Sequence, residues 1–205
     1  MKAVLRGLDI RCAVAGCLVM LMALCASAPV LAQNQGAAPA APMRAAGTVQ
    51  VAFTPWDDAE ALIVKTIAEA RHQVLVQAYS FTSRAIATAL IAARQRGVDV
   101  RVLADREQLF NSENSRIPEL VAAHIPVWLE VRYLSAHNKL MILDAGWPEQ
   151  AVIGGSYNWT QAAQHRNAEN VMVFRRHAEL TRAYLANWER HRRDALPYAG
   201  ARSGG

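Results

Sequence analysis

A histidine, a lysine and an aspartate follow one another in the order His-x-Lys-x4-Asp, at His137, Lys139 and Asp144. A short way downstream the chain reads Gly-Ser-Tyr-Asn at residues 155–158, and Glu169 follows. Together these positions supply an imidazole, an ammonium, a hydroxyl, an amide and carboxylates. Such groups can attack a phosphodiester and hold its negative charge without a metal ion. The spacing therefore predicts phosphoryl chemistry.

Two pairs in this set are spaced to share a face. Residues two apart on a strand point to the same side of a sheet, and the apolar run 140–143 predicts a strand beside His137 and Lys139. Histidine presents a neutral ring nitrogen near neutral pH, so His137 is the candidate nucleophile. Lys139 would place a positive charge on a phosphoryl oxygen, and Ser156 and Asn158 are candidate donors to the same phosphate.

The two carboxylates complete the predicted catalytic set. Glu169 is expected to accept a hydrogen bond from the second ring nitrogen of His137 and thereby orient the ring. The alternative for Glu169 is a salt bridge elsewhere. Asp144 is the remaining candidate, although its place at the end of a strand suits a residue that fixes a turn or a partner strand. No metal site and no cofactor are expected.

The elements that must position these residues are visible in the apolar pattern. Short alternating or continuous apolar segments are typical of strands, and longer segments with helical spacing lie between them. The predicted strands span residues 49–53, 74–81, 98–103, 125–129, 139–143, 151–154 and 169–174, and the predicted helices 57–70, 83–96, 113–123 and 179–193. Strands interleaved with helices predict a layered α/β domain.

The N-terminal part of the chain has a different composition. Residues 1–32 combine basic residues, an apolar run and small residues ending at Ala32, which is typical of a cleaved signal peptide. The alternative is an uncleaved N-terminal anchor. Residues 33–47, rich in Ala, Pro, Gly and Gln, predict a flexible linker, followed by a catalytic domain over residues 48–196 and a disordered tail over residues 197–205. The protein is therefore expected in the periplasm or outside the cell.

Cysteine usage and charge set further bounds. Cys12, Cys17 and Cys25 all lie in the predicted leader, so the mature domain would be stable through packing alone, without disulfides. The formal net charge is +5, and cleavage after Ala32 would remove three basic residues and one acidic residue, leaving +3. That excess suits a polyanionic partner and equally suits an ordinary soluble surface.

The sequence resembles the phospholipase D superfamily, whose signature is the His-Lys-Asp motif. The similarity includes residues 78–82, 96–100 and 155–160 as well as the motif, and is greatest to short secreted bacterial endonucleases with a single motif. It implies a mixed β-sheet flanked by helices and a metal-independent phosphodiesterase that forms a phosphohistidine. The loop at residues 145–154 is longer than is usual in the family, which could affect substrate access.

The resemblance also implies a partner. In the family a second motif histidine protonates the leaving oxygen and then activates water, whereas this chain carries one motif. The second histidine must then come from another copy, so we expect a homodimer with His137 and its symmetry mate on the two-fold axis. In this scheme Lys139, Ser156 and Asn158 bind the phosphate, and Glu169 supports the histidine.

Three hypotheses for the function follow. The first is a sequence-nonspecific endonuclease acting on DNA, and on RNA as a further possibility. It is favoured by small size, a single motif and export of a basic protein, and by arginines near the C-terminus that could follow a phosphate backbone or form a solvated helix face. The second is a phospholipase acting on membrane lipids, which would need an apolar entrance. The third is a catalytically silent nucleic-acid-binding protein. Aromatic residues near the motif could stack on bases or pack internally; they are Trp147, Tyr157 and Trp159.

Overall fold

The computed structural model describes residues 40–200 of the 205-residue chain. The predicted leader and most of the predicted linker lie outside the described residues. Residues 40–47 are exposed and have no regular secondary structure, and the first strand begins at Thr48. Within the described range, no helix combines the length and the apolar character needed to cross a bilayer.

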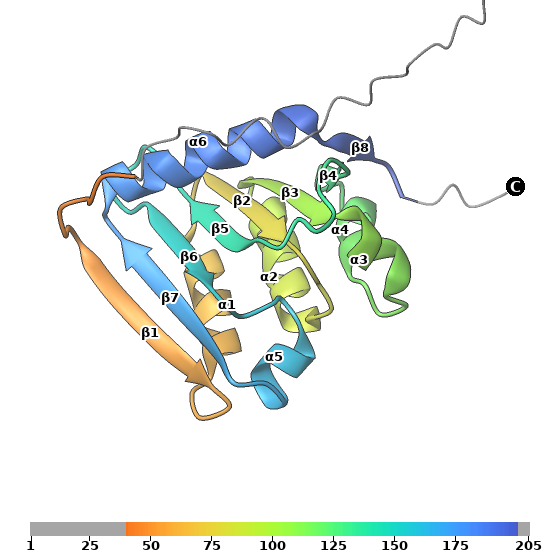
Figure 1. Cartoon of the computed structure of the whole chain (residues 1–205), viewed down its shortest axis with the longest axis horizontal. Helices are drawn as coiled ribbons and strands as arrows, with labels where there is room; N and C mark the ends of the chain where they lie inside the picture. The colour runs from red at the N-terminus through yellow and green to blue at the C-terminus, as the bar shows by residue number, and fades with distance from the viewer. Residues whose placement is uncertain (1–39, 201–205) are drawn as a thin grey trace, which may run out of the picture. The chain divides into compact units, whose positions relative to one another are not determined.

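Eight strands form one mixed sheet in the order β1-β7-β6-β5-β2-β3-β4-β8 (Figure 1). β2, β3 and β4 are parallel, and all other neighbours are antiparallel. The strands are β1 (Thr48–Thr54), β2 (Gln73–Ala78), β3 (Asp99–Asp105), β4 (Val127–Glu130), β5 (Lys139–Leu143), β6 (Ala151–Gly155), β7 (Glu169–Arg175) and β8 (Leu196–Tyr198). The predicted α/β class and mixed sheet are confirmed.

Within residues 40–200, six helices accompany the sheet: α1 (Ala59–Glu69), α2 (Arg84–Gln95), α3 (Arg106–Asn111), α4 (Ile117–Ala122), α5 (Gln161–His165) and α6 (Ala178–Asp194). α1 and α2 pack on one face of the sheet and α6 crosses the other (Figure 1). Side chains at helix N-termini accept hydrogen bonds from backbone N–H groups that would otherwise lack partners. At the start of α2, for example, the Ser83 hydroxyl accepts from the backbone N–H of Ile86.

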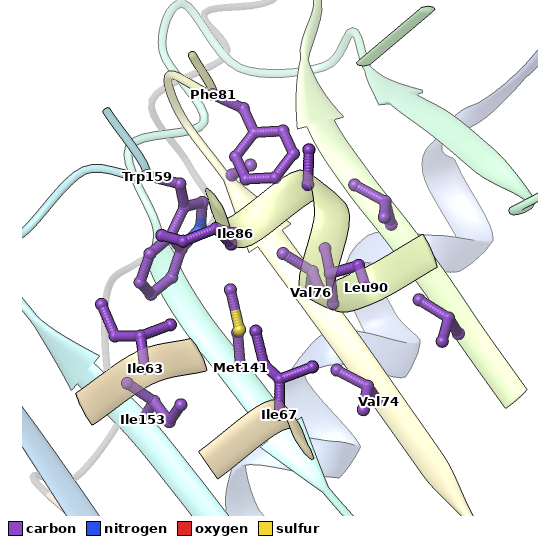
Figure 2. Close-up of a cluster of buried hydrophobic side chains, with 14 of the residues drawn as sticks. Ile63, Ile67, Val74, Val76, Phe81, Ile86, Leu90, Met141, Ile153 and Trp159 are labelled. Carbon is purple, nitrogen blue, oxygen red and sulfur yellow. The ribbon is translucent and has the colours of Figure 1, made fainter. Parts of the chain in front are cut away.

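The larger core lies between the sheet and the helices α1 and α2. It joins Ile63 and Ile67 of α1 to apolar residues of β2, β5 and β6 (Figure 2). Trp159 is buried here and donates its indole N–H to the carbonyl of Gln77 at 3.0 Å. Tyr157 is equally buried, so both aromatic residues pack internally and neither is available for stacking on a base.

α6 covers only part of the opposite face. Its Trp188 packs with apolar residues of the central strands, and its indole N–H donates to the carbonyl of Val76 at 3.2 Å. On the edge strand β1, however, Val49, Val51 and Phe53 are 56, 45 and 52% exposed. Val49 and Val51 pair with Phe174 and Met172 of β7, which are half-buried. We call these three residues of β1 the apolar strip.

Two expectations at the C-terminal side of the fold are wrong. The predicted helix over residues 113–123 is shorter, because α4 begins at Ile117 with a proline in its first turn. The predicted disordered tail starts too early, since Pro197 and Tyr198 belong to β8 and pair with Trp128 and Val127 of β4. A three-residue strand containing proline lacks the alternation by which strands are recognised in a sequence.

Candidate active site

The predicted site residues gather where several central strands end. β2 ends at Ala78, which pairs with Lys139 at the start of β5. Leu140 pairs with Gly154 near the end of β6, and Gly155 pairs with Val171 near the start of β7. The sheet register therefore brings Lys139, Ser156, Asn158 and Glu169 to one end of the sheet. His137 precedes β5 at this same end.

Tyr79, which follows β2 directly, organises the histidine and the lysine. Its ring lies against the exposed His137 ring, with centroids 4.3 Å apart and a 60° angle between the planes. The Lys139 Nζ lies 4.7 Å from the centroid of the same Tyr79 ring, a cation–π contact, and donates to the His137 carbonyl oxygen at 3.0 Å. The pattern of residue types did not identify Tyr79, although its position directly after a buried strand places it at the sheet end where ligands bind.

Burial tunes the charge of Lys139. The lysine side chain is almost fully buried, and desolvation lowers its pKa from 10.5. The negative charge of Glu169 acts in the opposite direction and raises that pKa. Lys139 and Glu169 are therefore electrostatic neighbours, and Glu169 helps to keep the ammonium protonated.

Ser156 and Asn158 present the expected polar groups. The Ser156 Oγ accepts hydrogen bonds from the backbone N–H of Asn170 at 3.1 Å and from its side-chain Nδ2 at 3.3 Å. The Asn158 Oδ1 is buried and makes no hydrogen bond with any described residue. Gly155 has a φ of +144°, and a Cβ there would meet the Asn170 carbonyl oxygen at 2.2 Å. Glycine is therefore required for the close approach that places Ser156.

Glu169 is placed differently from the expectation. Its Oε1 accepts a hydrogen bond from Asn167 at 2.9 Å, and its backbone N–H donates to Thr54 Oγ1 at 3.1 Å. Among the hydrogen bonds of residues 40–200, none joins Glu169 to His137. The negative charge of Glu169 instead acts on Lys139, whose pKa it raises.

Asp144 lies at the opposite end of β5 from Lys139, roughly 17 Å away at the usual rise of a strand. Its buried carboxylate accepts the backbone N–H groups of Arg71, His72 and Gln73 at 2.9, 2.7 and 2.8 Å. These bonds hold the start of β2 against the end of β5. The position corrects the inclusion of Asp144 among the catalytic residues and suits the turn-fixing alternative.

Two further features of the sequence lie at this far end. The long loop after Asp144 connects the ends of β5 and β6 that are remote from His137, so it does not border the site. Its Trp147 stacks on His72, with centroids 4.2 Å apart. Arg175 and Arg176 are two of the C-terminal arginines that could follow a phosphate backbone or form a solvated face. They lie at the end of β7 on this same side and form ion pairs with Glu69 and Glu149.

In residues 40–200, no group of three or more histidine, cysteine, aspartate or glutamate side chains is arranged to hold a metal ion. The groups that lie at this end of the sheet are an imidazole, an ammonium, a hydroxyl and a side-chain amide. They can supply a nucleophile and charge stabilisation to a phosphodiester.

Known proteins share this chain's sequence and fold. The family described as "Cardiolipin synthase, PLD-like domain" matches residues 63–192. A "Phospholipase D" from Rickettsia felis is 41% identical over 140 residues, which cover 68% of this chain and 67% of that protein. A "Mitochondrial cardiolipin hydrolase" from Drosophila melanogaster is 30% identical, over an alignment that covers 63% of this chain and 57% of that protein.

A solved structure agrees with these relatives. The crystal structure of Nuc from Salmonella typhimurium, a phospholipase D family member, is 30% identical and superposes with a TM-score of 0.68. The superposition covers 75% of this chain and 99% of Nuc. The family match extends over more than half of the chain and contains the whole His-x-Lys-x4-Asp motif. The chain therefore belongs to the phospholipase D-like family of phosphodiesterases.

Proposed function

We propose that this protein is a metal-independent, sequence-nonspecific endonuclease. It hydrolyses DNA, and RNA as a further substrate, through a phosphohistidine at His137 in a site shared by a homodimer. The observation that carries the proposal is the placement of His137 and Lys139 against the ring of Tyr79. One phosphate in front of that ring would meet the imidazole and the ammonium together.

The reaction proceeds in two displacements. A ring nitrogen of His137 bonds to phosphorus while the bond from phosphorus to the leaving oxygen breaks. That oxygen takes a proton from the imidazolium of the partner subunit's His137, which becomes neutral. The neutral ring then removes a proton from water, whose oxygen attacks phosphorus and breaks the phosphorus–nitrogen bond. Lys139, Ser156 and Asn158 hold the phosphoryl oxygens throughout.

A second copy completes the site. The motif occurs once in this sequence, and a second copy of the chain would supply the second motif histidine that the mechanism needs. The apolar strip supports such an association, because Val49, Val51 and Phe53 form an exposed apolar row on an edge strand of the sheet. Phe53 pairs with Asn170, the residue that contacts Ser156, so the strip reaches the site. We propose that this strip forms part of the dimer interface.

Nucleic acid is favoured as the substrate by the likeness to small proteins with a single motif. The fold of the small protein Nuc is matched over nearly its full length, and the single motif and basic charge are those of the short endonucleases that the sequence resembles. A polyanionic substrate suits a basic protein, since each phosphate contact releases counterions. We also propose that the protein acts in the periplasm or outside the cell, after cleavage near Ala32.

A phospholipase is the second candidate. Relatives named "Phospholipase D" and "Mitochondrial cardiolipin hydrolase" support it. The exposed side chains Trp56 and Leu134 support it as well, being 82% and 99% accessible in loops at the site end of the sheet. Large apolar side chains at a rim can insert into the headgroup region of a bilayer. This candidate keeps the same reacting groups and changes only the diester.

The test is nicking of supercoiled plasmid by the purified protein in excess EDTA, beside His137→Ala and His72→Ala. We expect nicking by the wild type and by His72→Ala, which alters an exposed histidine at the far end of the sheet. We expect none from His137→Ala. Activity of His137→Ala equal to the wild type would exclude the phosphohistidine route. Conversion of cardiolipin in vesicles to phosphatidic acid and phosphatidylglycerol, with plasmid left intact, would establish the phospholipase instead.

A further inference from the structure

Asp105, at the end of β3, ties the nucleophile to its surroundings. Its side chain is buried, with 2% of the residue exposed. The Oδ1 accepts the backbone N–H of Gln108 at 2.9 Å and so caps α3. The Oδ2 accepts the backbone N–H of Ala136 at 2.8 Å. Ala136 directly precedes His137, in a segment without helix or strand.

The residue on the other side of His137 is anchored as well. The carbonyl of Asn138 accepts the backbone N–H of Tyr79 at 3.0 Å. His137 is therefore bracketed by one bond to Asp105 and one bond to the strand end of β2. Without the first bond, the histidine would follow a loop whose preceding residues, Tyr133 and Leu134, are exposed.

Asp105 also reaches Tyr79 through a second route. The Gln108 side chain, held at the start of α3 by the Asp105 cap, donates from Nε2 to the Tyr79 hydroxyl at 3.1 Å. The Tyr79 ring in turn contacts His137 and Lys139. Both oxygens of one carboxylate thus act on the reacting groups, one through the backbone of Ala136 and one through the Tyr79 ring.

We propose that Asp105 is a positioning residue for the reaction, which fixes the His137 ring against Tyr79 in the attacking geometry. The inference rests on the proposed role of His137 as nucleophile. Capping of α3 accounts for Oδ1 alone, whereas the bond to Ala136 uses Oδ2. Asparagine and serine cap helices about as well as aspartate, but asparagine turns a donor toward one of the two N–H groups and serine is too short to reach both. Asp105→Asn and Asp105→Ser therefore separate the cap from the anchor.

The experiment compares full-length wild type, Asp105→Asn, Asp105→Ser and Asp99→Asn on bis(p-nitrophenyl) phosphate in EDTA. Asp99 is a half-exposed carboxylate at the other end of β3 and is the matched control. We expect kcat to fall about 100-fold in both Asp105 variants, with KM within about threefold of wild type, because misplacing a reacting group by an ångström has that effect. Asp99→Asn should match the wild type. Wild-type kcat in the folded Asp105 variants would overturn the proposal.

A second readout needs no substrate. The Tyr79 ring should shift the proton resonances of the His137 ring, since the two rings lie 4.3 Å apart. We expect this shift to collapse toward the value of a free histidine in Asp105→Asn and to persist in Asp99→Asn. An unchanged shift in Asp105→Asn would overturn the proposal even if kcat falls. A wild type that cleaves no diester would overturn the proposed function, and the shift alone would then decide the placement of His137.

A third variant covers loss of folding. If the Asp105 variants do not fold, Gln108→Ala is tested in their place. It changes a half-buried side chain and removes only the hydrogen bond to the Tyr79 hydroxyl. We expect about a tenfold fall in kcat with the His137 shift partly reduced, because one of the two routes remains. Wild-type values for both quantities would contradict the route through Tyr79 and with it the proposal.

Discussion

Ser156 receives both polar hydrogens that Asn170 directs toward it. Its Oγ accepts from the backbone nitrogen at 3.1 Å and from Nδ2 at 3.3 Å. A hydroxyl has two acceptor lone pairs and one proton. With both lone pairs used, the Ser156 hydroxyl proton is left to donate outward, which is the role expected of a group that holds a phosphoryl oxygen.

The first prediction concerns that proton. Ser156→Ala should lower kcat by about 100-fold, because one aligned donor to a developing negative charge contributes on that order. The melting temperature should change little, since Ser156 is exposed. Steady-state kinetics with plasmid or a small diester measures the effect, with Thr88→Ala on the outer side of α2 as a hydroxyl-deleting control. A Ser156→Ala enzyme with wild-type kcat would remove Ser156 from the phosphate site.

The second prediction concerns pH. Burial lowers the pKa of Lys139 from 10.5, so its ammonium is lost, and phosphate binding weakens, at a pH below that of an ordinary lysine. Glu169 raises the pKa of Lys139, so Glu169→Gln should move the alkaline fall in kcat/KM to lower pH. Glu149→Gln, in the remote loop, should leave the profile in place. If the alkaline fall in kcat/KM of Glu169→Gln stays at the wild-type pH or moves to higher pH, Glu169 does not act on the charge of Lys139.

The same shift has a consequence for stability. Because burial disfavours the charged form, the unfolded chain binds the Lys139 proton more tightly than the folded chain does. The contribution of Lys139 to the free energy of unfolding therefore rises with pH between its lowered pKa and 10.5. Lys139→Met should abolish that pH dependence of the free energy of unfolding, measured by denaturant titration. If the pH dependence persists in Lys139→Met, another group causes it.

The third prediction uses two adjacent glycines. Gly155→Ala should destabilise the fold by more than about 2 kcal/mol, because its positive φ and the 2.2 Å approach to the Asn170 carbonyl both oppose a side chain. Gly154→Ala should stay within about 0.5 kcal/mol of wild type, since a Cβ there meets nothing within 4 Å. Urea titration of both proteins checks the contrast. Equal stability of the two variants would show that the backbone relaxes around Gly155.

The fourth prediction separates stability from catalysis. Asp144→Ala should cost about 3 kcal/mol, because it leaves three backbone N–H groups without their shared acceptor. Below its melting temperature the folded variant should retain wild-type kcat, since Asp144 lies at the far end of β5 from Lys139. Glu149→Ala is the control for loss of a carboxylate on this side. A large fall in kcat of fully folded Asp144→Ala would show that Asp144 takes part in catalysis.

The fifth prediction tests the shared site. Val51→Lys places a charge in the apolar strip, so it should dissociate the dimer and remove activity while circular dichroism stays native. Gln50→Lys adds the same charge to the adjacent exposed position of β1, on the other face, and should leave both properties intact. Sedimentation velocity and plasmid nicking measure the two effects. An active wild type that sediments only as a monomer would contradict the shared site.

Much of this fold was predictable because its strands and main helices carry clear apolar patterns. The pairing of strands was not, since β1 and β7 lie far apart in the chain and meet only through the sheet. For the same reason, residue types and spacing did not identify Tyr79 or Asp105, whose partners come from other strands. The expected bond between Glu169 and His137 depended on such a register, and in the structure the Glu169 carboxylate accepts a hydrogen bond from Asn167.

The long loop between β5 and β6 lies at the end of the sheet remote from His137. Residues 146–149 of this loop are exposed. Changes in loop length there alter the connection between two strands without moving the groups that meet the phosphate. The loop is therefore a suitable insertion point for a fluorescent label or an affinity handle, with which the enzyme could be followed on its substrate while its chemistry stays intact.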